Sequence, residues 1–190
     1  MKRILLTLLA IGLLLPLNAQ EEHRYGVKSG YMKTVSILGE HKSYNYYWFD
    51  EYGYKEKGVT ESDMGEFGTF TSTMIFIGEE GWAINADNQV KKMEGRPEVN
   101  WLTITPEQMK KYKIEKIGEE VYKGYPCTVY TEERKQMLSK VMVTNWIYKG
   151  IIIRQHFKKK LSADTYVELE ELKENAKVPA GTFDIPQTQE

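Results

Sequence analysis

The residue types that most often do chemistry are few in this sequence and stand far apart. The three histidines are His23, His41 and His156, and none has a second His or Cys at the spacing of metal ligands. Ordinary surface histidines are the simpler interpretation. We therefore expect no bound metal.

Cys127 is the only cysteine, which excludes a disulfide within the chain. It lies in the strand-like run 125–131, where no neighbour in sequence supplies the base or positive charge that a reactive thiolate needs. We expect a buried, unreactive thiol. The sequence also has no Gly-x-Ser-x-Gly elbow and no Gly-rich phosphate loop, so we expect no enzymatic activity and no cofactor.

The charge composition argues against nucleic acid as a partner. The chain has 26 Lys and Arg residues against 27 Asp and Glu, a formal net charge of −1 at pH 7. No overall positive field therefore attracts a polyanion. The length of 190 residues is typical of a single domain.

The first twenty residues have the pattern of a secretory signal peptide. Two basic residues precede an apolar run over 4–17, and Ala19 is a small residue at its end. The run is short for a membrane span, and the junction has no cysteine that could carry a lipid. We predict a signal peptide over 1–20, one domain over 21–190, and a periplasmic location without stable membrane insertion after cleavage. An uncleaved anchor helix is the alternative.

Most of the domain is predicted to form short strands joined by tight turns. Runs rich in aromatic and β-branched residues alternate with Gly, Asp, Asn and charged clusters, and the connections are too short for parallel crossovers. We predict about eleven antiparallel strands, and a sheet of that size must curl. The expected strands are 26–38, 42–50, 54–60, 68–77, 82–85, 89–93, 113–119, 125–131, the two strands of a hairpin over 141–160, and 165–172.

One helix interrupts the strands. Thr105 is a capping residue, Pro106 suits the first helical position and Gln108 completes a capping box, so a helix is expected to run to about Tyr112. The stretch 99–104 before it is apolar enough to dock against the sheet. The helix therefore lies across the concave face as a lid, or it packs as an ordinary helix.

The hairpin over 141–160 is expected to turn at Lys149-Gly150, because glycine readily adopts a positive φ. A two-residue turn pairs Tyr148 with Ile151 and Trp146 with Ile153. We expect Trp146 to face the concavity. The side chains predicted to share its face are Met142, Tyr148, Ile151, Ile153 and Phe157, whereas Arg154 and His156 fall on the opposite face.

The strand over 42–50 has aromatic side chains on both faces. Tyr44, Tyr46 and Trp48 share one face, while Tyr47 and Phe49 share the other. Rings with a polar tip suit the rim of a cavity. Core packing combined with surface tyrosines is the alternative explanation.

Three segments resemble the LolA-like superfamily of exported proteins, which includes periplasmic lipoprotein carriers. They are GEEVYKGYPCTVY over 118–130, NWIYKG over 145–150 and KVPAGTFDIP over 177–186. The resemblance implies a strongly curved antiparallel sheet, a half-open barrel, closed over by helices around an apolar cavity that accepts acyl chains. It implies no enzymatic activity. Only one helix is evident here, where the carriers have several.

We therefore expect a mainly β, LolA-like fold with a short helical lid. The expected function is to hold a lipid, a lipoprotein acyl chain or another apolar ligand. A protein-protein interaction module of the cell envelope is the alternative. From the strand faces, the expected ligand-binding residues are Tyr46, Trp48, Ile75, Trp101, Met142, Trp146, Tyr148, Ile153 and Phe157.

Overall fold

The computed structural model describes residues 23–136, 139–159 and 163–186, and the predicted signal peptide lies outside them. Two single 3-10 turns, η1 (Glu51–Gly53) and η2 (Gly65–Phe67), and one helix, α1 (Pro106–Tyr112), accompany the strands. The strands are β1 (Gly30–Leu38), β2 (His41–Asp50), β3 (Lys55–Asp63), β4 (Thr69–Ile77), β5 (Glu80–Ile84), β6 (Val90–Met93), β7 (Ile114–Tyr122), β8 (Tyr125–Gln136), β9 (Ser139–Tyr148), β10 (Ile151–Lys158) and β11 (Thr165–Glu174).

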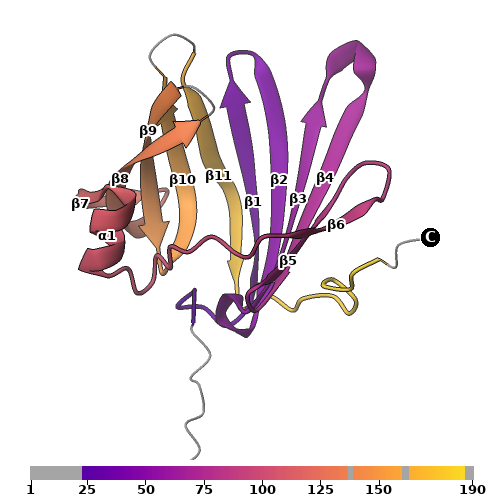
Figure 1. Ribbon diagram of the computed structural model, residues 1–190, viewed down its shortest axis with the longest axis horizontal. Helices are drawn as coiled ribbons and strands as arrows, with labels where there is room; N and C mark the ends of the chain where they lie inside the picture. Colours follow the sequence, from indigo (N-terminus) through magenta and orange to yellow (C-terminus); the bar gives the residue numbers. More distant parts are fainter. Residues whose placement is uncertain (1–22, 137–138, 160–162, 187–190) are drawn as a thin grey trace, which may run out of the picture.

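All eleven strands belong to one antiparallel sheet in the order β6-β5-β4-β3-β2-β1-β11-β10-β9-β8-β7. The last strand of the chain therefore lies beside the first. Because β6 and β7 form the two ends of this order, the curved sheet stays open as a half-barrel (Figure 1). The expected mainly β fold is confirmed. Its boundaries differ most at β1, which begins at Gly30, and at β8, which runs on to Gln136.

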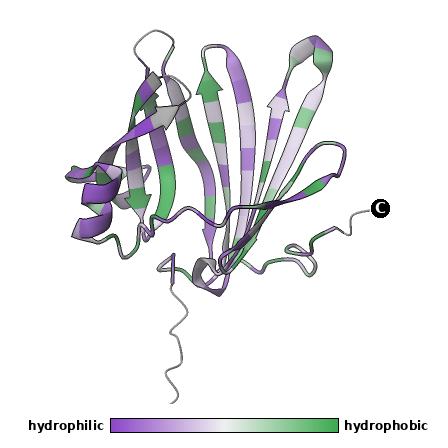
Figure 2. Cartoon of the chain, viewed as in Figure 1, coloured by the Kyte–Doolittle hydropathy of each residue, from purple (hydrophilic) through white to green (hydrophobic). Residues whose placement is uncertain are grey.

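The helix begins as the sequence predicts, with a capping box. The Thr105 hydroxyl accepts a hydrogen bond from the Gln108 amide at 3.2 Å, and the Gln108 side chain accepts one from the Thr105 amide at 3.1 Å. α1 contacts β7 at one end of the sheet and is mostly hydrophilic (Figure 2). Residues 94–105, called here the crossing segment, run from β6 across the sheet to α1 (Figure 1). The extended crossing segment thus spans the sheet, and α1 lies at its far end.

The strands β10 and β11 pair over four residues only, from Arg154 to Phe157 on β10. Residues 151–153 of β10 and residues 169–174 of β11 do not pair with each other. Ile151 and Ile153 of β10 and Leu169 of β11 instead belong to one hydrophobic core cluster. Apolar packing therefore replaces backbone pairing where the two halves of the sheet separate.

The β9–β10 hairpin turns where the sequence predicts. Lys149 and Gly150 have φ values of 47° and 81°, and two positive values are typical of a type I′ turn. Tyr148 pairs with Ile151, as expected. A glycine is needed for a second reason, because a Cβ at position 150 would overlap the carbonyl oxygen of Arg24.

The predicted register of this hairpin is wrong beyond its first two pairs. An extra residue in β10 shifts the ladder, so Arg154 rather than Ile153 pairs with Trp146. The Arg154 guanidinium consequently lies over the Trp146 ring, 4.4 Å from its centre, on the face where no charge was expected. Gln155 pairs with Asn145 on the opposite face. A one-residue shift exchanges the faces of every following side chain, including His156 and Phe157.

Candidate functional site

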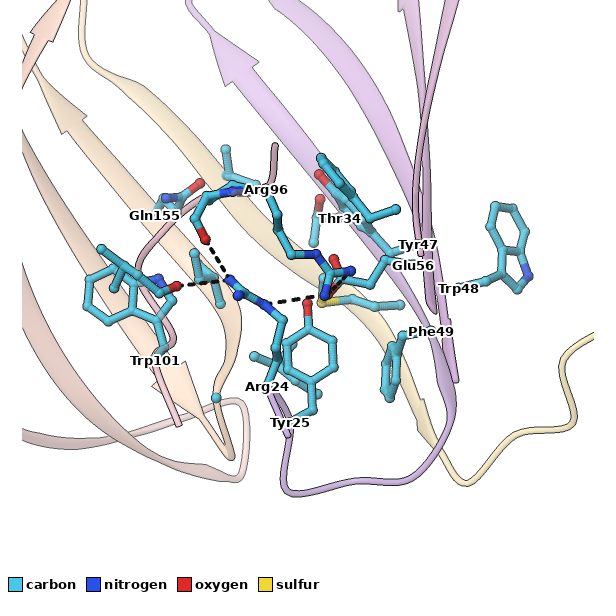
Figure 3. A pocket seen from close by; sticks show the side chains of 18 residues that line it. Arg24, Tyr25, Thr34, Tyr47, Trp48, Phe49, Glu56, Arg96, Trp101 and Gln155 are labelled. Carbon is cyan, nitrogen blue, oxygen red and sulfur yellow. Dashed lines mark hydrogen bonds and ion pairs between the residues drawn. The ribbon is translucent and has the colours of Figure 1, made fainter. Parts of the chain in front are cut away.

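A cavity of about 230 Å³ lies between the sheet and the crossing segment (Figure 3). Elements far apart in sequence build its walls: the N-terminal stretch, β1 to β4, β10, β11 and the crossing segment. Most of its lining is apolar. The apolar side chains include Met32, Tyr47, Phe49, Phe76, Ile151, Ile152 and Val167 of the sheet and Pro97, Val99 and Trp101 of the crossing segment.

Alternation along β2 decides which aromatic rings reach this cavity. Tyr47 and Phe49 point to it, whereas the ring of Trp48 points away (Figure 3). The Trp48 ring lies 5.4 Å from that of Tyr31 and 6.5 Å from that of Tyr46, measured between ring centres. The aromatic strand therefore divides into a cavity-lining face and an outer aromatic row.

Three charged side chains, Arg24, Glu56 and Arg96, interrupt the apolar lining (Figure 3). Arg96 Nη2 lies 3.2 Å and Arg24 Nε 4.0 Å from the same oxygen, Glu56 Oε1. Arg96 Nη1 donates a hydrogen bond to the Gly53 carbonyl oxygen at 2.6 Å, and its guanidinium lies 5.2 Å from the centre of the Phe76 ring. The cavity therefore has one charged side within apolar walls.

Arg24 also fixes the cover of the cavity. Its Nη2 donates hydrogen bonds to the carbonyl oxygens of Pro97 and Val99, each at 3.0 Å. Nearby, Asn100 Nδ2 donates to the His23 carbonyl oxygen at 2.9 Å. These bonds hold the crossing segment against the N-terminal stretch, and so keep it over the face of the sheet that lines the cavity.

Burial shifts the ionisation of this charged cluster. Desolvation raises the pKa of Glu56 above its ordinary value of 4.5, although the charges of Arg96 and Arg24 oppose the rise. Desolvation, followed by the charge of Glu56, raises the pKa of the neighbouring Tyr25 well above 10.0. Desolvation also lowers the pKa of Arg96. Because burial is the main cause of all three pKa shifts, water that enters the cavity would reduce these shifts.

Other polar side chains on this face of the sheet satisfy one another. Asn45 Nδ2 donates to Thr34 Oγ1 at 3.2 Å. Gln155 Nε2 donates to Asn145 Oδ1 at 2.7 Å, and Asn145 Nδ2 donates to Glu132 Oε1 at 2.8 Å. Buried polar groups need such partners. The concave side is thus partly polar, and its apolar lining concentrates under the crossing segment.

The nine predicted ligand-binding residues do not converge on this cavity. Trp101 lines it, and Trp48 borders it with its ring pointing away. The lining does not include Tyr46, Ile75, Met142, Trp146, Tyr148, Ile153 or Phe157. A ligand-binding role for these seven stays a prediction.

The hairpin residues among them have other contacts. Trp146 Nε1 donates to Glu120 Oε2 at 2.9 Å, and the expectation that Trp146 faces the concavity is wrong because its face is opposite to that of Gln155. The Tyr148 hydroxyl donates to Glu174 Oε1 at 2.6 Å. Ile153 is fully buried in the core cluster with Trp146.

Arg24, Glu56 and Arg96 escaped the sequence analysis. Glu56 stands between Lys55 and Lys57, a pattern typical of a solvated strand, and Arg96 stands in a turn-like Gly-Arg-Pro stretch. No local spacing connects the three residues. The one available signal for Glu56 is that it is a charged residue at a strand position whose side chain points inward.

Within residues 23–136, 139–159 and 163–186, no three or more His, Cys, Asp or Glu side chains gather as metal ligands. The helix in this part of the chain is too short to cross a membrane.

Residues 32–185 match the family model described as "Domain of unknown function (DUF4412)". A search of curated proteins found no match. Two solved structures have similar folds. One is an uncharacterized conserved protein from Thermus thermophilus, with a TM-score of 0.52, 9% identity, and 83% of this chain and 84% of that chain covered. The other is a chain of the Pseudomonas aeruginosa MucA/MucB complex, with a TM-score of 0.55, 12% identity, and 88% of this chain and 59% of that chain covered.

A putative outer membrane lipoprotein-sorting protein domain from Vibrio parahaemolyticus also matches, with a TM-score of 0.40, 14% identity, and 87% of this chain and 94% of that chain covered. At these identities the likeness concerns the fold alone. The half-open antiparallel fold that the resemblance to LolA-like proteins implied is confirmed by the strand order.

Proposed function

The chain belongs to the DUF4412 family of domains of unknown function, and we propose that it is a non-enzymatic binding protein of the cell envelope that holds an apolar ligand. The observation that carries this proposal is the cavity of about 230 Å³, with apolar side chains from the sheet on one side and the crossing segment on the other. Removing apolar surface from water stabilises a complex by roughly 25 cal/mol per Å². Such a cavity therefore favours an apolar guest.

The size of the cavity restricts what it accommodates. Pockets for whole drug-sized ligands measure about 300 to 1,000 Å³, and this one is smaller. It suits part of a ligand, such as one alkyl chain, whose remainder emerges beside the crossing segment. A lipid or the acyl chain of a lipoprotein is the ligand class that we propose.

The proposed cellular location rests on the N-terminal sequence. A signal peptide over 1–20 would export the chain, and we propose the periplasm as its destination. Sequencing the N-terminus of the protein recovered from the envelope fraction tests this, because cleavage leaves a chain that begins near residue 21.

A second candidate function is protein binding, favoured by the likeness of the fold to a chain of the MucA/MucB complex. Ile117 and Val121 on the edge strand β7 are exposed apolar side chains. An edge strand offers unpaired backbone groups to a partner strand. If protein binding is the function, no lipid occupies the cavity.

A cavity-filling substitution tests the proposed function. Val167→Phe adds bulk to the cavity wall, so it should weaken binding of the neutral dye N-phenyl-1-naphthylamine by about fivefold or more, as expected from an overpacking cost of about 1 to 3 kcal/mol. Fluorescence titration measures the dissociation constant. Native mass spectrometry of protein purified from the periplasm then identifies any lipid that remains bound.

The matched control is Thr144→Phe. Threonine has nearly the shape of valine, and Thr144 pairs with His156 on the face opposite to Gln155 and the cavity. This variant should bind the dye like the unmodified protein. Equal loss of binding in both variants, or no dye binding by the folded unmodified protein, would contradict the proposal and favour protein binding.

A further inference from the structure

Arg96 is held in place at one edge of its guanidinium and unsatisfied at the other. Nη1 donates to the Gly53 carbonyl oxygen at 2.6 Å, and the plane lies over the Phe76 ring. The side chain is only 3% exposed. Among the described residues, neither Nε nor Nη2 has a hydrogen-bond partner. A buried guanidinium with two idle donors is unfavourable, so these donors call for a partner.

The two idle donors form a matched pair. Nε–H and Nη2–H lie on the same edge of the planar guanidinium, and this fork fits the two oxygens of a carboxylate. Glu56 does not serve as this partner, because its Oε1 lies 3.2 Å from Arg96 Nη2 without making a hydrogen bond. A bidentate acceptor therefore has to come from outside the cluster.

The charges around Arg96 also leave room for one anion. Among the charged side chains that line the cavity, Arg24 and Arg96 carry +2 and Glu56 carries −1 when ionised, which gives +2 − 1 = +1. Glu79 also acts on Arg96 but lies outside this lining. A guest with one negative charge brings this sum to zero. Neutralisation of a buried cluster strengthens binding, because an unpaired charge in an apolar site is unfavourable.

From this geometry we propose that Arg96 binds the carboxylate of an amphipathic ligand, with the alkyl chain of that ligand in the adjacent cavity. The inference rests on the proposed function and adds to it the chemistry of the head group. Both parts of the site lie within one cavity, since Arg96 lines it together with Phe76, Tyr47 and Val167. The ligand class is a long-chain carboxylic acid, either free or as part of a larger lipid.

The test compares two probes that share a chain and differ in charge. Dodecanoate and its methyl ester are titrated into the delipidated full-length exported protein by isothermal titration calorimetry at neutral pH. Dodecanoate should bind at least about ten times more tightly than the ester, because hydrogen bonds to charged groups contribute a binding free energy of that size. Equal affinity for the two probes would overturn the inference and assign the idle donors to water.

Two arginine variants locate the preference. Arg96→Met should remove most of the preference for the acid, and Arg96→Lys should restore only part of it, because an ammonium keeps the charge without the fork. Arg154→Met is the matched control, since Arg154 is also partly buried over aromatic rings but lies on the Trp146 face. It should keep the full preference. If Arg96→Met does not fold, the comparison of acid and ester in the unmodified protein decides alone.

The outcomes separate this inference from the proposed function. One outcome is that the protein binds N-phenyl-1-naphthylamine but binds dodecanoate no more tightly than the methyl ester, or not at all. This result overturns the carboxylate site and still supports an apolar ligand in the cavity. Absence of dye, acid and ester binding overturns both. A dodecanoate preference that survives in a folded Arg96→Met variant overturns the assignment to Arg96.

Discussion

At the scale of single residues, the cavity depends on charges that are unfavourable to bury. Glu56 Oε1 and two nitrogens of Arg96 are buried without hydrogen bonds among the described residues. Such groups destabilise the fold, because desolvation of a charge is only partly offset by an ion pair. The position of the two Arg96 nitrogens in a mostly apolar lining is the reason to propose a ligand for them.

The raised pKa of Glu56 predicts how this residue affects stability with pH. Below its ordinary pKa of 4.5, Glu56 is protonated in both the folded and the unfolded chain. As pH rises through the window from 4.5 to the raised folded pKa, the unfolded chain loses the proton first, so the folded state loses stability relative to it. Glu56→Gln, which mimics the protonated form, should escape this loss.

The measurement is the free energy of unfolding in urea for the unmodified protein and Glu56→Gln, from about pH 4 to about pH 7. The difference, unmodified minus variant, should fall as pH rises. The comparison cancels the opposite effect of carboxylates with lowered pKa, such as Asp164 and Glu133. A difference that rises with pH would mean that the Arg96 and Arg24 charges outweigh burial.

At the scale of elements, the β9–β10 hairpin combines a turn fixed by sequence with a bulge fixed by packing. Its turn residues Lys149 and Gly150 both have positive φ, which favours a right-handed twist of the two strands. The extra residue in β10 then places Arg154 over Trp146 and turns Gln155 toward Asn145. The bulge therefore gives β10 one core face and one cavity face.

Gly150→Ala should destabilise the protein more than the matched change Gly39→Ala. Both glycines have positive φ, of 81° and 59°, so each alanine bears a backbone cost of about 1 to 2 kcal/mol. A Cβ at position 39 has no atom within 4 Å, whereas one at position 150 overlaps the Arg24 carbonyl oxygen. Gly150→Ala should therefore lose at least about 1 kcal/mol more. Urea unfolding measures both, and equal losses would show that Arg24 moves aside freely.

At the scale of the whole molecule, the cavity exists only once the sheet has curled. Met32 of β1 and Ile152 of β10 line the same space although β11 lies between their strands in the sheet. The crossing segment covers this space through bonds from Arg24 to Pro97 and Val99. Binding of the proposed ligand in this cavity would therefore be coupled to global folding.

This coupling predicts that a ligand raises the stability of the entire domain. A ligand that binds only the folded state adds about 2.7 kcal/mol at a hundredfold excess over its dissociation constant. The Tm of the unmodified protein should rise with the concentration of dodecanoate, measured by circular dichroism. Val167→Phe should show a much smaller rise. An equal rise in both proteins would place the ligand outside the cavity.

The local structure of this protein could be predicted from neighbouring residues along the chain. Alternation and turn residues located all eleven strands, the Thr105 capping box located the helix, and Lys149-Gly150 located the hairpin turn. These features depend on neighbours within a few residues, and a single sequence contains that information. The curl of the sheet followed from the number of strands, and its half-open form was implied by the resemblance to LolA-like proteins.

The face of the sheet that lines the cavity depends on tertiary contacts. One extra residue in β10 exchanged the faces of Arg154 and Gln155, and the sequence contains no local signal for it. The meeting of Arg24, Glu56 and Arg96 likewise depends on a sheet that brings β3 against the crossing segment. Faces and charge clusters arise from long-range pairing, which the spacing of residues along the chain does not specify.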